Sequence, residues 1–111
     1  MDKTTVKLDK ATVYKIVEDM HKALGKYGIK DNRIALFGSF LNDNAHENSD
    51  IDMIVISDSF EGKNLFERID MTLKAESDVR NRYIAPMDIL LKTPQEYNHS
   101  KKAYFNSEIV I

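Results

Sequence analysis

The chain has 111 residues, of which 42% are hydrophobic and 31% are charged, and its formal net charge is −2. The length and composition predict a soluble protein with one domain, residues 1–111, built around one small core. The absence of cysteine excludes disulfides and thiolate chemistry. No apolar run approaches the roughly 20 residues of a membrane span, and the N-terminus lacks an apolar signal sequence, so we expect a cytoplasmic protein. The even balance of acidic and basic residues argues against a nucleic-acid-binding face.

The first predicted element is an amphipathic helix over residues 8–27. Asp9 is a plausible N-cap, and Gly25 and Gly28 mark the C-terminal end. Apolar residues at helical spacing form one face of this helix: Val13, Ile16, Val17, Met20 and Leu24. We expect that face to pack on the core.

A short apolar strand over residues 33–37 leads into Gly38-Ser39, which we interpret as a tight turn that opens a short helix. Glycine lets a backbone approach a ligand closely, and free N–H groups at a helix start favour a phosphate. Residues 42–49 are polar and predict a loop. The turn therefore predicts a phosphate cradle.

A second strand over residues 51–56 begins beside two carboxylates, Asp50 and Asp52. Alternate side chains of a strand share a face, so these two point the same way with Cα atoms roughly 6.6 Å apart. Carboxylates at the mouth of a buried strand are costly without a cation, and a pair of divalent ions would suit them. Beside a phosphate cradle, this pair predicts a site for a nucleoside triphosphate.

The remaining chain predicts two helices and two strands. Met87–Leu91 forms a strand that carries Asp88. Residues 63–81 form a helix with a charged, solvated remainder and one mostly apolar stripe: Leu65, Ile69, Thr72, Leu73 and Glu76. Thr93-Pro94 begins a helix that runs to about Phe105, and residues 108–111 form a short β-prone segment. Few strands separated by helices predict an α/β or α+β fold with a small mixed sheet of three to four strands.

The combined pattern resembles the DNA polymerase beta-like nucleotidyltransferase superfamily. Its signature is Gly38-Ser39, ten further residues, then Asp50-Ile51-Asp52 and an apolar strand, with Asp88 as candidate third carboxylate on a later strand. The small size is similar to that of the minimal nucleotidyltransferases, which are often encoded beside a HEPN-domain partner. The chain lacks the Gly-Lys-Thr/Ser sequence of a P-loop NTPase.

This resemblance implies a catalytic role for Asp50, Asp52 and Asp88, which would hold two Mg²⁺ ions, with Asp88 also serving as general base. Gly38 and Ser39 would bind the phosphates of ATP or another nucleoside triphosphate. A nucleoside monophosphate, expected to be AMP, would pass to a hydroxyl acceptor while pyrophosphate leaves.

The sequence departs from the family just after the aromatic residue that follows the serine. Many relatives have Ala-Arg-Gly there, whereas this chain has Leu41-Asn42-Asp43. A basic residue near the triphosphate is lost, and Asp43 would repel phosphate unless it points outward. The departure bears on nucleotide affinity and catalytic rate more than on fold.

Three functions stay open from the sequence. The acceptor could be a tyrosine of a HEPN toxin, which would make this chain the antitoxin; the chain could be a relict module that merely caps a partner; or it could be a subunit of a small-molecule nucleotidyltransferase. The small core leaves little room for an acceptor pocket, so we expect a protein partner, either a HEPN protein or a second copy. Candidate contacts are the helix from Pro94 to Phe105, with Tyr97 and Tyr104, and the C-terminal run Ile109–Ile111.

Overall fold

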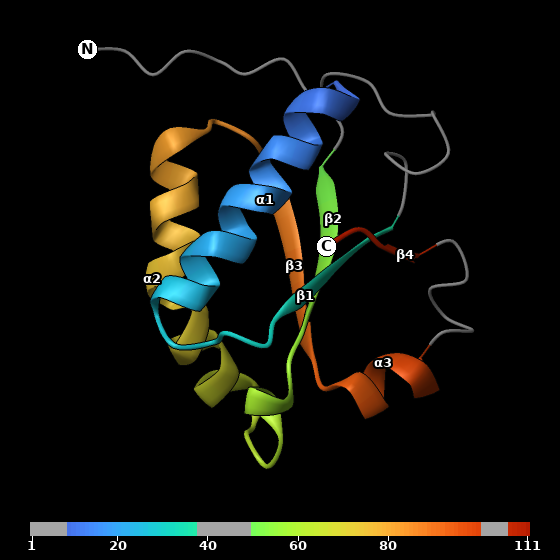
Figure 1. Ribbon diagram of the computed structural model, residues 1–111. Helices are drawn as coiled ribbons and strands as arrows, with labels where there is room; N and C mark the ends of the chain where they lie inside the picture. The colour runs from blue at the N-terminus through green and yellow to red at the C-terminus, as the bar shows by residue number, and fades with distance from the viewer. Residues whose placement is uncertain (1–8, 38–49, 101–106) are drawn as a thin grey trace.

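The computed structural model describes residues 9–37, 50–100 and 107–111. In this part of the chain, a four-stranded mixed sheet carries two long helices on one face (Figure 1). The elements in chain order are α1 (Lys10–Lys26), β1 (Arg33–Phe37), β2 (Ile51–Ile56), η2 (Asp58–Phe60), α2 (Leu65–Arg82), β3 (Met87–Lys92), α3 (Pro94–His99) and β4 (Glu108–Ile109). The expected α/β class, with a small mixed sheet and helices packed on it, is confirmed.

The strand order in the sheet is β3-β2-β1-β4. β1 runs antiparallel to both β2 and β4, whereas β2 and β3 run parallel and are joined by the crossover helix α2. Neighbouring parallel strands begin at the same end of the sheet. The topology therefore brings the first residues of β2 and β3 together, although 30 residues separate the end of β2 from the start of β3 in sequence.

Helix α1 forms as its sequence predicts. The Asp9 carboxylate accepts a hydrogen bond from the Thr12 amide at 2.8 Å, which satisfies one of the free N–H groups of the first turn. After the last turn, Gly28 adopts a φ of +102°, a conformation that strains other residues. All five residues of the predicted apolar face are buried: Val13, Ile16, Val17, Met20 and Leu24.

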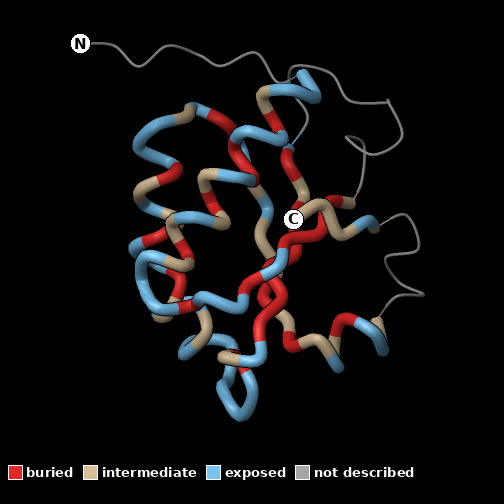
Figure 2. The backbone as a smooth tube through the Cα atoms, in the orientation of Figure 1, coloured by how far each residue is buried: buried red, intermediate tan, exposed pale blue. Residues whose placement is uncertain are grey.

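Apart from the half-buried Asp52, the central strand β2 is buried on both faces, as the unbroken apolar run Met53–Ile56 requires. Ile51, Met53 and Val55 pack in the core beneath α1 and α2. Ile54 and Ile56 lie on the opposite face, in a smaller cluster with Tyr97 of α3. Figure 2 shows this buried centre in red, with exposed residues on the outer helices and turns.

Helix α2 differs from its prediction in the face that it buries. Thr72, Ala75 and Val79 point into the core. Of the predicted stripe, only Thr72 is buried. Its larger apolar members are exposed, together with one neighbour: Leu65 at 61%, Phe66 at 81%, Ile69 at 43% and Leu73 at 54%. The small core-facing side chains let α2 approach the sheet and α1 closely, so the bulky ones are left in solvent.

The C-terminal segment packs against the core of the domain. Tyr97 is only 3% exposed, and Val110 and Ile111 pack against the main core cluster. Tyr97 is thus too buried to contact a partner, the partly buried run Ile109–Ile111 stays a candidate contact, and Tyr104 and Phe105 lie outside the described residues. None of the described helices is both long and apolar enough to cross a bilayer.

Candidate active site

The parallel pairing of β2 with β3 sets Asp52 directly beside Asp88. Paired residues of neighbouring strands point to the same face, and such strands lie about 4.8 Å apart. Asp50 precedes β2 by one residue, so it belongs to the same end of the sheet. The three candidate carboxylates thus gather where β2 and β3 begin, at the end opposite α3 (Figure 1).

Asp52 and Asp88 lie on the face of the sheet that α1 and α2 do not cover. Ile54 and Leu90, which lie two residues further along the same strands and therefore on the same face, belong to the cluster around Tyr97. On the other side of Asp52, the antiparallel register places Phe37 at the end of β1. Phe37 is a site neighbour that sequence reasoning did not identify, because only the pairing of β1 with β2 reveals it.

The electrostatics of Asp52 show that the carboxylates act on one another. Partial burial raises the pKa of Asp52 above its ordinary value, and the negative charges of Asp88 and then Asp50 raise it further. Asp50 and Asp88 are themselves exposed. Asp52 is therefore the member of the group whose charge most needs a cation.

Hard divalent cations prefer carboxylate oxygens, so the donor chemistry of this group fits Mg²⁺. Within the described residues, however, no three His, Cys, Asp or Glu side chains converge closely enough to enclose an ion as they stand. An open set of ligands is what a nucleotide-handling Mg²⁺ site requires, because phosphate oxygens supply the remaining positions. Gly38, Ser39 and Asp43 lie outside the described residues, so the predicted phosphate cradle stays a prediction.

Comparison with known proteins decides the family. Residues 12–110 match the nucleotidyltransferase domain family. The chain belongs to this family. Its reaction class is accordingly that of a nucleotidyltransferase, an enzyme that transfers a nucleoside monophosphate from a nucleoside triphosphate. No curated protein matches the chain significantly.

Solved structures support the nucleotidyltransferase fold. A candidate nucleotidyltransferase from Sulfolobus solfataricus is 14% identical, with 96% of this chain and 90% of that one covered and a TM-score of 0.56. A second candidate nucleotidyltransferase is 21% identical over 90% of this chain and 98% of that one, with a TM-score of 0.58. A toxin-antitoxin structure with AMP-PNP is 24% identical over 76% of this chain and 57% of that one; its TM-score of 0.41 is too low to support an argument.

Proposed function

We propose that this nucleotidyltransferase transfers AMP from ATP to a hydroxyl group of a partner protein, with Mg²⁺ as cofactor. The observation that carries the proposal is the in-register pairing of Asp52 with Asp88, with Asp50 two residues before Asp52. This arrangement gives one end of the sheet the concentrated negative charge that a divalent cation would balance.

In the proposed reaction, the acceptor oxygen attacks the α-phosphorus of ATP, the bond to the β-phosphate oxygen breaks, and pyrophosphate leaves. Asp50, Asp52 and Asp88 would hold the metal, which supplies charge neutralisation of the phosphates and acidifies the acceptor hydroxyl when bound. Asp88 is exposed at the edge strand, so its carboxylate is accessible to take the proton of an incoming hydroxyl. Gly38 and Ser39 would bind the departing phosphates.

The acceptor that we propose is a tyrosine of a HEPN-domain toxin, in keeping with the resemblance to minimal nucleotidyltransferases. The protein would then act as the antitoxin. The exposed apolar stripe of α2 supports a protein partner, because four large apolar side chains in adjacent positions are unusual on the surface of a small domain without one: Leu65, Phe66, Ile69 and Leu73.

The test of the reaction is incorporation of label from α-labelled ATP in the presence of Mg²⁺ and the co-purified partner. We expect label on the partner with the wild-type chain, and a loss of at least about a hundredfold in initial rate for Asp52→Asn and for Asp88→Asn, as expected for residues that stabilise charge in the transition state. Asp70→Asn is the matched control, because Asp70 is an exposed carboxylate on α2.

Intact-mass measurement of the partner identifies the product. A mass increment of one adenylyl group that maps to a tyrosine supports the proposed acceptor. Undiminished labelling by a chain that carries both Asp→Asn changes would show that the carboxylates do not bind the metal. Label that appears on a free small molecule in the absence of partner would refute the antitoxin role while leaving the reaction class intact.

A further inference from the structure

Two exposed apolar residues, Ile84 and Pro86, precede Asp88 and form what we call the apolar shelf. Every second residue from the end of α2 onward packs against the main core cluster: Tyr83, Ala85, Met87, Ile89 and Leu91. Ile84, Pro86 and Asp88 alternate with these residues and are exposed, Ile84 at 42%. A period of two indicates an extended backbone, in which alternate side chains share a face. The shelf therefore lies on the same face of the sheet as Asp88.

The sequence favours this extended conformation. Pro86 has no amide hydrogen, and it disfavours a helical conformation at Ala85. Tyr83, which ends α2, is already extended, with φ of −127° and ψ of 131°. The Tyr83 hydroxyl donates to the Asp19 carboxylate of α1, which anchors that side chain on the helix side of the sheet. The shelf residues consequently point to the side that α1 and α2 do not cover.

A backbone hydrogen bond fixes the shelf beside the carboxylates. The Ile51 amide donates to the Pro86 carbonyl at 2.8 Å, so Pro86 lies next to the first residue of β2, which follows Asp50. Alternate residues of a strand are roughly 6.6 Å apart, which sets Pro86 about that far from Asp88 and Ile84 about twice as far. The shelf thus extends outward from the proposed active site.

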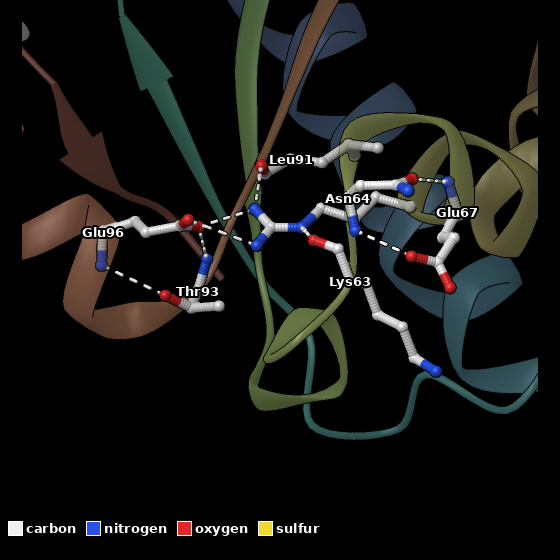
Figure 3. A network of polar contacts seen from close by, with 7 residues as sticks. Lys63, Asn64, Glu67, Leu91, Thr93 and Glu96 are labelled. Atoms are coloured by element: carbon white, nitrogen blue, oxygen red, sulfur yellow. Dashed lines mark hydrogen bonds and ion pairs between the residues drawn. The ribbon is translucent and has the colours of Figure 1, made fainter.

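Two arginines of α2 hold the free edge of β3. The Arg80 guanidinium donates to the Met87 carbonyl at 3.4 Å. Arg68 donates to the Leu91 carbonyl at 3.2 Å and is held there by Glu96, at 2.6 Å (Figure 3). An edge strand otherwise invites pairing with a strand of another chain. Because these outward carbonyls are occupied, a partner meets the side chains of β3 and not its backbone.

The strand order indicates which reactant meets the shelf. β1 lies on the side of β2 away from β3, and its last residue, Phe37, leads into the predicted phosphate cradle. In phosphoryl transfer, the attacking and leaving oxygens lie roughly in line on opposite sides of the phosphorus. If the departing phosphates are on the β1 side, the acceptor approaches from the β3 side. The shelf lies on that side.

We propose that the apolar shelf binds the aromatic ring of the acceptor and thereby selects a phenolic hydroxyl, that of a tyrosine, over an aliphatic one. The inference rests on the proposed function, in which the acceptor hydroxyl meets Asp88. A tyrosine has an apolar ring with a polar tip, and a ring packed on Pro86 directs its hydroxyl across the roughly 6.6 Å to Asp88. Serine and threonine carry a hydroxyl but no ring to cover the shelf. Ile84 and Pro86 are thus specificity-determining residues.

The first test is binding, followed by two-dimensional ¹H–¹⁵N NMR of the labelled chain in buffer that contains EDTA. The probes are N-acetyltyrosinamide, N-acetylserinamide and AMP. We expect saturable shifts of the Ile84, Met87 and Asp88 amides with the tyrosine probe and none with the serine probe. Shifts of these amides with AMP but not with the tyrosine probe would assign the shelf to the nucleobase and overturn the inference, as would equal shifts with the tyrosine and serine probes.

The second test uses the variant I84S/P86A, which removes most of the apolar surface under the ring. We expect it to bind the tyrosine probe about tenfold more weakly and to lose about tenfold in kcat/KM for transfer to the co-purified partner. Its Kd for ATP with Mg²⁺ should stay that of the wild type, which a general loss of structure would not allow. The single variant I84S should show part of the same loss.

Y14S is the matched control and should behave as the wild type, because Tyr14 is 43% exposed on α1, which covers the other face of the sheet. The NMR spectrum reports whether each variant is folded. Transfer at the wild-type rate by I84S/P86A would overturn the inference while leaving the proposed function intact. A wild-type chain that transfers no label would refute the proposed function, whereas binding of the tyrosine probe would still measure the shelf.

Discussion

The pairing of Asp52 with Asp88 predicts a measurable repulsion in the metal-free protein. Two carboxylates about 5 Å apart repel by about 1 kcal/mol in a water-like environment and by about 3 kcal/mol at an effective dielectric constant of 20. Asp88 is exposed and Asp52 is only partly buried, so the lower figure applies. Replacing Asp52 by asparagine also removes the cost of a partly buried charge, which is the largest cause of its raised pKa.

We therefore expect Asp52→Asn to stabilise the metal-free chain by about 1 kcal/mol, or roughly 4 °C in Tm. Asp88→Asn should give a smaller gain, because Asp88 is exposed. The double variant should gain less than the sum of the single variants by about 1 kcal/mol, because the repulsion can be removed only once. Thermal and urea unfolding in EDTA, combined as a double-mutant cycle at pH 7, measure this coupling.

The pH dependence supplies an independent check of sign. A raised folded-state pKa means that the folded protein binds more protons than the unfolded chain, so Asp52 costs stability as the pH rises from its ordinary value of 3.8 through the raised value. The stability advantage of Asp52→Asn over the wild type should accordingly be full at neutral pH and vanish below about pH 3.

Asp70→Asn is the control for the double-mutant cycle and should show no coupling to Asp52. Strictly additive effects of the two site variants would mean that the carboxylates do not face one another.

Three further predictions concern stability and surface. Glu96→Gln should destabilise the chain by about 1–2 kcal/mol, after allowance for the exposure of Glu96, because Arg68 loses its counter-charge. The folded-state pKa of Glu96 is lowered from 4.5 to about 2, so the loss of stability should be full above about pH 5 and shrink as the pH falls toward 2. Unfolding measured at several pH values tests this dependence. Val17→Ala should cost about 1–3 kcal/mol in urea unfolding because Val17 is 1% exposed in the core, and an unchanged midpoint would contradict that packing. Phe66→Ser should alter stability by less than about 0.5 kcal/mol because Phe66 is 81% exposed, yet reduce co-purification of the partner; equal recovery would exclude Phe66 from the contact.

The elements with strong periodicity could be predicted from sequence alone. The α1 face and the bounds of β2 agree with the structure because an apolar repeat over many residues leaves one favourable orientation. The proximity of Asp52 and Asp88 could be expected only from the family resemblance. It depends on which strands pair and in which direction, and those choices are made by long-range packing that no local pattern encodes.

Helix α2 shows why a local pattern can indicate the wrong face. The predicted stripe shares Thr72 with the face that is buried, but its bulky apolar members lie outside the face that contains Arg68, Thr72 and Ala75. A charged residue on this face argues against burial when it is considered alone. Glu96 and two backbone carbonyls nonetheless satisfy Arg68 at the sheet edge, which makes that face the buried one.

The position of α2 also connects its exposed stripe with the carboxylates. β3 is an edge strand of the sheet, and Arg80, in the last turns of α2, donates to the Met87 carbonyl at 3.4 Å, one residue before Asp88. Leu73 is the stripe residue nearest to Arg80, and seven residues of helix separate the two by roughly 10 Å. The stripe thus lies on the helix side of β3, whereas Asp88 lies on the uncovered face of the sheet, so the two are reached together only around the β3 edge. A partner that covers the stripe must extend around this edge to present a hydroxyl to Asp88, and binding energy from the stripe would then orient that hydroxyl for transfer.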